Sequence, residues 1–264
     1  MSFDVSADAY DRFMGRYSAT LSSQLAEFAG VAAGRRALDV GCGSGMLTAE
    51  LVARLGAGAV AAIDPAELFV LAVRERNPGV DVRHGAAESL PFADAEFDAT
   101  LAQLVIHFMA DAVAGLREMA RVTRPGGVVA ASVWDLAGGR APITPFWRAV
   151  IELDPGARDE TARAGVRQGD LPALFAAAGI EDVRQAELHA SVEHPTFADW
   201  WDPFALGVGP AGVYLEGLDG DRRAALRERC HALLGDGPFT LPAVAWAARG
   251  TTCTNIHAPA TVAR

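Results

Sequence analysis

The chain has few cysteines, no basic cluster and no long uncharged apolar run. Its three cysteines include no Cys-x-x-Cys pair, so we expect reduced thiols in the cytoplasm and neither a disulfide framework nor a metal site. Its 33 acidic and 23 basic side chains give a net charge of -10, and such a field repels the phosphates of a nucleic acid. No apolar run reaches the length of a membrane span, and residues 1–10 lack the apolar segment of a signal peptide.

A glycine-rich stretch at residues 37–48 organises the chain. A short apolar run ends in three glycines at alternate positions, Gly41, Gly43 and Gly45, and a helical pattern follows from Thr48. This pattern predicts a strand, a tight turn and the N-terminus of a helix. Glycine suits the turn because it adopts backbone angles that a side chain resists and lets a ligand touch the main chain. The free amides of the first helical turn favour a polar or anionic group.

The spacing of the glycines differs from the G-x-G-x-x-G fingerprint of dinucleotide-binding proteins. Gly45 comes one residue early, and Asp39 lies two residues before the first glycine. A carboxylate there would repel a pyrophosphate but can accept hydrogen bonds from an ammonium group or from the amides of the turn. With Cys42 and Ser44 between the glycines, the turn therefore indicates a nucleoside that carries an amino acid.

A second acidic residue follows the next apolar segment. Residues 58–63 predict a parallel strand that ends in Asp64 and Pro65, roughly 20 residues past the glycines, as in nucleotide-binding βαβ units. A carboxylate at that place can accept both hydroxyls of a ribose. It can also cap the helix that begins near Ala66, and the two roles are compatible.

The glycine turn with Asp39 resembles motif I of the class I S-adenosylmethionine-dependent methyltransferases. Residues 85–92 (GAAESLPF) and 121–127 (RVTRPGG) are similar to stretches of the same family, and the resemblance is nearest to the branch of the ubiquinone and menaquinone methyltransferases. It implies S-adenosylmethionine as the cofactor. It also implies an α/β fold, a doubly wound and mostly parallel Rossmann-like sheet of seven strands, whose last two strands, here 183–192 and 239–249, form an antiparallel hairpin.

The resemblance also assigns residues around the cofactor. The N-terminal segment YDRFMGR resembles one that folds over the cofactor, and it implies contacts from Tyr10 and from Arg16, the latter with the cofactor's carboxylate. Simple packing of the first helix is the alternative. Gln103, at the end of the strand at 97–103, matches a position that contacts the cofactor.

Residues 85–92 depart from the family pattern Gly-Asp-Ala-Glu-x-Leu-Pro-Phe at Ala86. An Asp or Asn commonly stands there and accepts a hydrogen bond from the adenine amino group. The resemblance therefore leaves the backbone of Ala86 and Ala87, with Glu88 nearby, to contact the adenine edge.

The carboxyl end of the strand at 97–103 is where we expect the reacting group, because ligands of open parallel sheets lie beyond the strand ends. His107 is the only histidine placed beside that point. Its unperturbed pKa of about 6.5 suits a general base, although a packing or hydrogen-bonding role is the simpler interpretation. The sequence lacks an Asp/Asn-Pro-Pro-Tyr/Phe tetrad and a Pro-Cys nucleophile, two motifs of enzymes that methylate nucleobases, so we expect a small-molecule acceptor.

An aromatic-rich insertion separates the last two strands. We divide the chain into a core of residues 1–195 and 235–252 with an N-terminal cap, a helical insertion of residues 196–234, and a tail of residues 253–264. Trp200, Trp201 and Phe204, with Trp147 of the core, carry more apolar surface than an exposed loop needs. They predict either a hydrophobic seam that fastens the insertion to the core, or a lid whose aromatics line an apolar substrate pocket.

Two other classes of protein remain open from the sequence. A dehydrogenase or nucleotide-sugar enzyme would share the fold type, but the G-x-G-x-G spacing and Asp39 disfavour it. A noncatalytic protein that binds S-adenosylmethionine or its demethylated product would carry the same binding residues.

Overall fold

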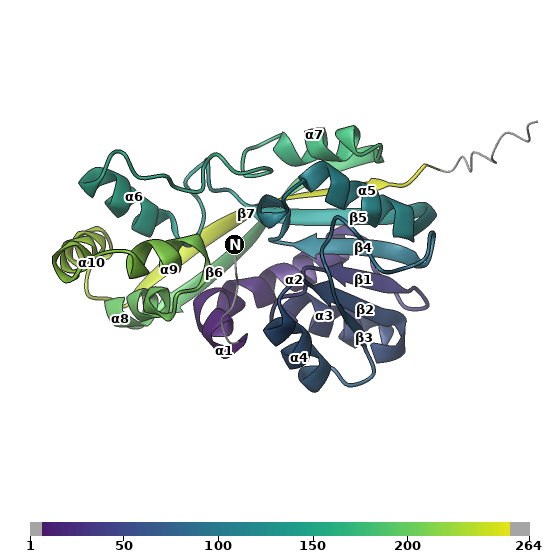
Figure 1. The fold of residues 1–264 in the computed structure, drawn as a ribbon, viewed down its shortest axis with the longest axis horizontal. Helices are drawn as coiled ribbons and strands as arrows, with labels where there is room; N and C mark the ends of the chain where they lie inside the picture. Colours follow the sequence, from purple (N-terminus) through teal and green to yellow (C-terminus); the bar gives the residue numbers. More distant parts are fainter. Residues whose placement is uncertain (1–6, 254–264) are drawn as a thin grey trace, which may run out of the picture.

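One seven-stranded sheet, in the order β3-β2-β1-β4-β5-β7-β6, crosses the computed structural model, which describes residues 7–253 (Figure 1). Strands β1 to β5 run parallel, and β7 is antiparallel to both β5 and β6. This arrangement confirms the doubly wound, mostly parallel sheet and the antiparallel hairpin at its edge. The strands are β1 Ala37–Val40, β2 Val60–Asp64, β3 Asp81–His84, β4 Phe97–Gln103, β5 Thr123–Trp134, β6 Glu181–His194 and β7 Phe239–Thr251.

The central strands are buried on both faces. Every residue of β1 and β2 is buried, as expected for parallel strands that are covered by helices on both sides. In the ladder, Asp39 of β1 stands beside Ala62 of β2 and Leu101 of β4. The carboxyl ends of these strands therefore meet at one edge of the sheet, where the predicted site residues lie.

One group of helices lies apart from the parallel strands. Figure 1 shows α6, α8, α9 and α10 gathered beyond the parallel strands, at the far ends of β6 and β7. The α-helices are α1 Ala7–Tyr10, α2 Arg16–Phe28, α3 Met46–Leu55, α4 Glu67–Arg76, α5 Ala112–Val122, α6 Thr144–Leu153, α7 Asp170–Ala177, α8 Phe197–Trp201, α9 Gly209–Glu216 and α10 Gly220–Leu234. A π-helix, η1 Asp11–Gly15, joins α1 to α2, and three short 3₁₀ turns are η2 Ala57–Ala59, η3 Ile106–Phe108 and η4 Asp202–Leu206.

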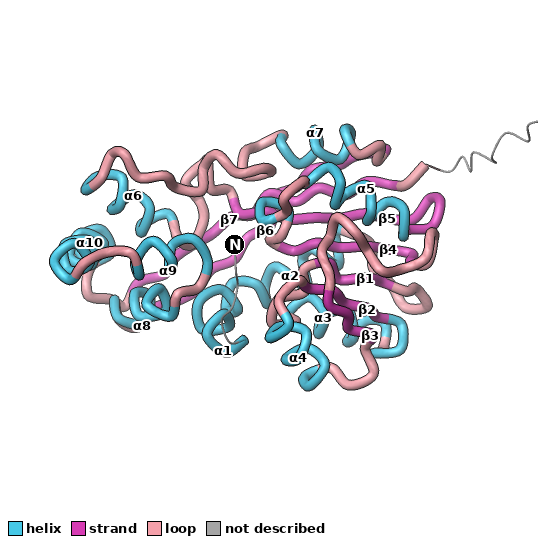
Figure 2. The backbone as a smooth tube through the Cα atoms, viewed as in Figure 1, coloured by secondary structure: helices cyan, strands magenta, loops and turns pink. Residues whose placement is uncertain are grey.

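Two segments outside the parallel strands contribute to the site, namely the loop at 154–169 and the predicted insertion. Residues 154–169, between α6 and α7, contain neither helix nor strand (Figure 2). The predicted insertion consists of α8, η4, α9 and α10, so it is helical as expected. Of the predicted tail, residues 254–264 lie outside the described part of the chain.

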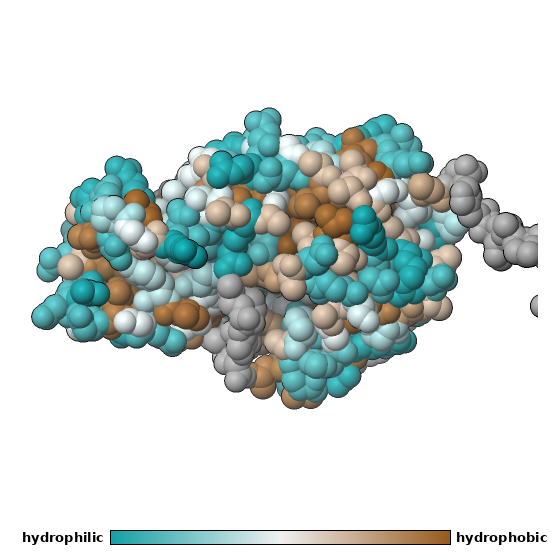
Figure 3. Space-filling model, turned by 45° about the horizontal axis from the view of Figure 1, so that its top comes forward, coloured by the Kyte–Doolittle hydropathy of each residue, from teal (hydrophilic) through white to brown (hydrophobic). Residues whose placement is uncertain are grey.

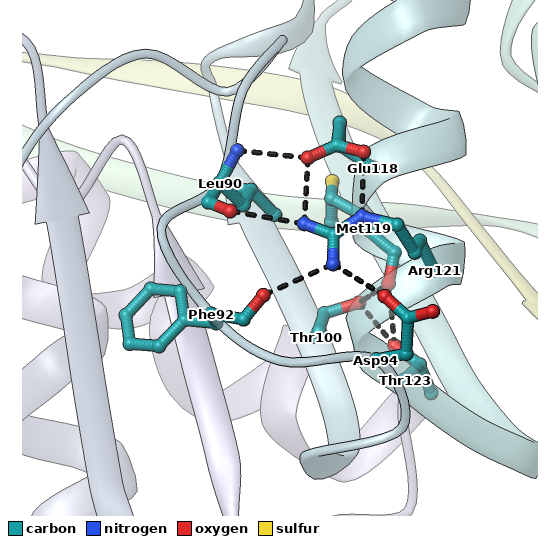
Figure 4. Close-up of polar contacts among 8 residues, drawn as sticks. All are labelled: Leu90, Phe92, Asp94, Thr100, Glu118, Met119, Arg121 and Thr123. Carbon is teal, nitrogen blue, oxygen red and sulfur yellow. Dashed lines mark hydrogen bonds and ion pairs between the residues drawn. The ribbon is translucent and has the colours of Figure 1, made fainter.

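Arg121, in the last turn of α5, fastens the loop that follows β3 (Figure 4). It donates hydrogen bonds to the carbonyl oxygens of Leu90 (2.9 Å) and Phe92 (3.0 Å) and pairs with Asp94 and Glu118. Glu118 in turn accepts a hydrogen bond from the backbone N–H of Leu90 (2.9 Å). Hydrogen bonds to the two carboxylates hold the pKa of Arg121 above its ordinary value. This loop is therefore fixed from the α5 side.

The face drawn in Figure 3 is largely hydrophilic, with apolar patches between the polar side chains. Among residues 7–253, the large apolar side chains that are exposed are Leu68, Leu71, Leu153, Leu206 and Val213. No helix in that range is both long enough and apolar enough to span a bilayer.

Candidate active site

The turn between β1 and α3 depends on its three glycines. All three take left-handed backbone conformations, with φ of 70° at Gly41, 51° at Gly43 and 92° at Gly45, where a side chain would be strained. A Cβ added at Gly41 would also lie 2.6 Å from both γ carbons of Val105. At Gly43 the atom nearest to such a Cβ would be Tyr10 Cε1, at 3.9 Å. The main chain at Gly43 is therefore open to a ligand on the Tyr10 side.

Two buried carboxylates lie against this turn. Asp39 is 1% exposed and accepts a hydrogen bond from the Thr48 hydroxyl (2.6 Å), and burial raises its pKa to about 7. Asp64 accepts hydrogen bonds from the backbone N–H groups of Gly43 and Ala66, both at 2.8 Å. Burial raises the pKa of Asp64, although these two bonds act in the opposite direction. Each Asp64 oxygen keeps a second lone pair for a ligand.

A first cavity opens beside the turn. Ser44 Oγ and Gln103 Oε1, in its lining, are buried without a hydrogen-bond partner among the described residues. An unpaired buried polar atom is costly, so these two atoms fit a polar ligand. No arginine or lysine belongs to the described lining, which is unfavourable for a pyrophosphate. The expected cofactor residues that line the cavity are Tyr10, Asp39, Gly41, Cys42, Gly43, Ser44, Asp64, Pro65 and Gln103.

A second cavity adjoins the first, and Tyr10, Leu104 and Phe108 line both. Leu104 has a φ of 60°, a conformation that is uncommon for a residue with a side chain and that clusters at functional sites. The remaining lining residues come from η1, η3, the end of β5, two loops and the start of α9. They are Phe13, Met14, His107, Trp134, Leu136, Ile143, Glu160, Val208, Gly209, Pro210 and Ala211.

Comparison with known proteins decides the family. A family model described as "methyltransferase domain" matches residues 38–131. The chain is 36% identical over 186 residues to a demethylmenaquinone methyltransferase of Mycobacterium sp. (strain KMS), in an alignment that covers 63% of this chain and 79% of that one. The chain belongs to the S-adenosylmethionine-dependent methyltransferases.

Solved structures support the fold of this methyltransferase. It resembles a SAM-dependent methyltransferase from Aquifex aeolicus with a TM-score of 0.51 and 23% identity, over 66% of this chain and 87% of the other. It resembles the cyclase SpnF to a similar degree, with a TM-score of 0.56 and 20% identity over 89% and 81% of the two chains. A protein named a methyltransferase and one named a cyclase thus share this fold, so the fold alone does not determine the reaction.

Arg16, which we expected beside the cofactor's carboxylate, is engaged elsewhere in the methyltransferase. Its guanidinium pairs with Asp199 (2.7 Å) and donates to the carbonyl oxygen of Glu193 (2.6 Å), and the residue does not line the first cavity. The same Asp199 oxygen lies 2.8 Å from His194 Nδ1. Arg16 therefore joins α2 to β6 and α8, a long-range partnership that no local sequence pattern reveals.

The residues expected at the adenine edge also lie outside the first cavity, whose lining contains none of Ala86, Ala87 and Glu88. The Glu88 carboxylate accepts hydrogen bonds from the backbone N–H groups of Ala110 (2.7 Å) and Asp111 (3.3 Å), just before α5. Phe69 of α4, which the sequence did not single out, lines the cavity instead.

His107 lies in η3, directly after β4, and lines the second cavity. It is 6% exposed, and its Nδ1 has no hydrogen-bond partner among the described residues. Burial, together with the positive charge of Arg163, lowers the pKa of His107 to about 3. The imidazole is therefore neutral at neutral pH and has a nitrogen lone pair that can accept a proton or a hydrogen bond.

Glu160 reaches the second cavity from the loop at 154–169 and is 3% exposed. The indole N–H of Trp147 donates to its Oε1 (3.0 Å), and Arg163 Nε lies 3.5 Å from its Oε2. Arg163 also donates to the carbonyl oxygen of His107 (3.2 Å), so its guanidinium connects Glu160 to His107. Burial raises the pKa of Glu160, and the Trp147 bond and Arg163 oppose that rise.

The aromatic residues of the insertion pack together rather than around the second cavity. Trp200, Trp201 and Phe204 are 4%, 5% and 1% exposed. Phe204 stacks on Phe146 of α6 with 4.6 Å between ring centroids and meets the edge of Phe13 at 4.9 Å. None of the three expected insertion residues lines the second cavity, nor does Trp147, which contacts its wall through Glu160. The insertion reaches the cavity through residues 208–211 instead.

Proposed function

We propose that this methyltransferase transfers the methyl group of S-adenosylmethionine to a small and largely apolar molecule bound in the second cavity. The observation that carries the proposal is the wall of Tyr10, Leu104 and Phe108 that the two cavities share. A cofactor in one cavity and an acceptor in the other would meet there, at the carboxyl end of β4. Most of the remaining lining of the second cavity is apolar, as in small-molecule sites generally.

The donor and acceptor groups of the first cavity fit this cofactor. Asp64 is proposed to accept the ribose hydroxyls. Asp39, Ser44 and Gln103 supply polar groups for the amino acid portion, and the glycine turn lets that portion approach the main chain. When bound, S-adenosylmethionine supplies a methyl group on a positively charged sulfur, which departs as a neutral thioether. The residues of the chain then have to bind, align the two reactants and exclude water.

His107 is proposed to orient the acceptor and to receive a proton from it. Its neutral imidazole has the required lone pair at neutral pH. A pKa of about 3 in the ligand-free cavity also means that the ring holds a proton weakly, so His107 serves an acceptor that loses its proton readily or only as the methyl is transferred.

The insertion is proposed to be a cover for the acceptor. Residues 208–211 close one side of the second cavity, while α8 and η4 fasten the insertion to α6 through stacked aromatic rings. The lid and the seam thus belong to different parts of the same insertion.

A methyl-transfer assay tests the proposed function. The purified chain would be incubated with isotope-labelled S-adenosylmethionine and apolar acceptors, beginning with demethylmenaquinone because of the relative's name, followed by phenols and aromatic amines. We expect labelled product and S-adenosylhomocysteine in equal amounts, and mass spectrometry of the product identifies the methylated atom. Tight binding of S-adenosylmethionine without acceptor-dependent turnover across the panel would contradict the proposal.

A further inference from the structure

The second cavity has few polar side chains, and none of them is a permanent cation. Its ionisable side chains are Tyr10, His107 and Glu160, and no arginine or lysine belongs to its lining among the described residues. A carboxylate or phosphate on an acceptor would therefore find no cation in this lining. It would instead lie in an apolar cavity with the carboxylate of Glu160.

Glu160 has two partners that favour its charged form, against the burial that raises its pKa. Trp147 donates to one oxygen at 3.0 Å and Arg163 pairs with the other at 3.5 Å. A carboxylate offers about four acceptor sites, so two such partners leave sites for a ligand. Neither Trp147 nor Arg163 belongs to the lining of the cavity, so a ligand in the cavity that donates would be a further partner of Glu160.

His107 favours the same kind of ligand. Its Nδ1 is buried without a partner, and a neutral imidazole has one nitrogen that accepts and one that donates. A hydroxyl or an uncharged amino group can donate to such a nitrogen, whereas a carboxylate can only accept. Glu160 and the accepting nitrogen of His107 can therefore both take a hydrogen bond from a neutral donor.

We propose that Glu160 acts as a charge filter of the second cavity, which binds neutral acceptors carrying a hydrogen-bond donor and rejects carboxylates. The inference rests on the proposed function, since it names the chemical class of the acceptor in that site. An anion of suitable shape would lie against the Glu160 carboxylate in a desolvated site, where repulsion between like charges disfavours its binding.

Three naphthalene derivatives of similar size test the filter: 1-naphthol, 1-naphthoate and 1-methylnaphthalene. Their affinities would be measured by calorimetry on the intact chain saturated with S-adenosylhomocysteine. We expect 1-naphthol to bind at least about tenfold more tightly than either of the others, since it alone donates to the buried acceptors and carries no charge. Equal affinity for 1-naphthoate, equal affinity for 1-methylnaphthalene, or no binding of any of them would overturn the inference.

A matched pair of variants assigns the effect to Glu160. Glu160→Gln keeps the shape and an oxygen for the Trp147 indole but removes the charge, so the preference for 1-naphthol over 1-naphthoate should shrink about tenfold. Glu152→Gln removes the same charge from an exposed residue of α6 that pairs with Arg148 and Arg229, and the preference should stay unchanged. An unchanged preference in Glu160→Gln, with folding verified by thermal unfolding, removes Glu160 from the filter.

The calorimetry and the methyl-transfer assay together distinguish failure of the filter from failure of the proposed function. If S-adenosylhomocysteine does not bind the chain, the proposed function fails before any acceptor is added. If it binds, and the chain methylates carboxylates as readily as hydroxyls, methyl transfer stands and the filter alone is wrong.

Discussion

The two cavities are built from different kinds of sequence. The first is formed by the glycine turn after β1 and by side chains at the ends of β2 and β4, so its main residues follow short apolar runs directly. The second draws on η1, η3, the loop at 154–169 and the start of α9, and its lining residues Phe13 and Ala211 lie far apart in the chain. In the proposed assignment, the cofactor is thus bound by local motifs and the acceptor by tertiary contacts.

The largest expected effect of a substitution that separates the two regions is on the free energy of unfolding. Phe204→Ala removes a ring that is 1% exposed and stacks on Phe146, so the free energy of unfolding should fall by about 3–5 kcal/mol. Because Phe204 does not line the first cavity, the folded variant should bind S-adenosylhomocysteine normally. Urea unfolding and calorimetry measure the two quantities, with Leu206→Ala, at a 36% exposed neighbour, as the control. A small stability loss with a weakened cofactor would mean that the two regions are not separate.

The next effect is on cofactor binding. Asp64→Ala should lose charge-assisted hydrogen bonds worth about 1.5–3 kcal/mol each, and calorimetry with S-adenosylhomocysteine would record the weaker affinity. Asp81→Ala is the control, since Asp81 is an acid of neighbouring β3 that pairs with Arg83 and does not line the first cavity. Normal affinity in Asp64→Ala would remove this carboxylate from the site.

Asp39 predicts a pH dependence of stability. Its pKa is raised from 3.8 to about 7 in the folded chain, so between these pH values the folded state holds a proton that the unfolded state has released. The stability from this proton is complete below the lower value and is lost as the pH rises through the higher one. Urea unfolding from pH 4 to pH 8 should therefore show a steeper decline for the wild type than for Asp39→Asn. Parallel curves would show that Asp39 titrates normally.

The smallest effect concerns the segment that departs from the family pattern. Ala86 does not line the first cavity, so Ala86→Asp should leave the affinity for S-adenosylhomocysteine unchanged or slightly raised. Calorimetry on this variant is informative because a large loss of affinity would place the loop after β3 against the cofactor.

Most of the fold and much of the first cavity could be predicted from the sequence. Asp39, the glycines and Asp64 lie at strand ends, and parallel strands necessarily bring those ends together. Glu88 and Arg16 show the limit of this reasoning. Each matches a family position, but Glu88 binds the backbone before α5 and Arg16 binds Asp199, partners that only the folded chain supplies.

The second cavity could not be predicted for a related reason. Glu160 lies in a loop rich in Asp, Arg and Gly, and its position beside the cavity depends on contacts with Trp147 and Arg163. The tryptophans of the insertion gave a strong signal of burial, yet burial alone does not say whether an aromatic ring faces a ligand or another ring. Trp201 packs against Phe197 and Phe204, and the amino-acid composition of the segment does not predict these partners.

A crystal structure of the chain with S-adenosylhomocysteine bound is the most direct test of the division into a cofactor cavity and an acceptor cavity. We predict that the adenosine and amino acid portions fill the first cavity, with a ribose hydroxyl on Asp64. The sulfur should face the wall of Tyr10, Leu104 and Phe108, where the second cavity begins. A ligand that fills the second cavity, or a sulfur turned away from that shared wall, would contradict the division.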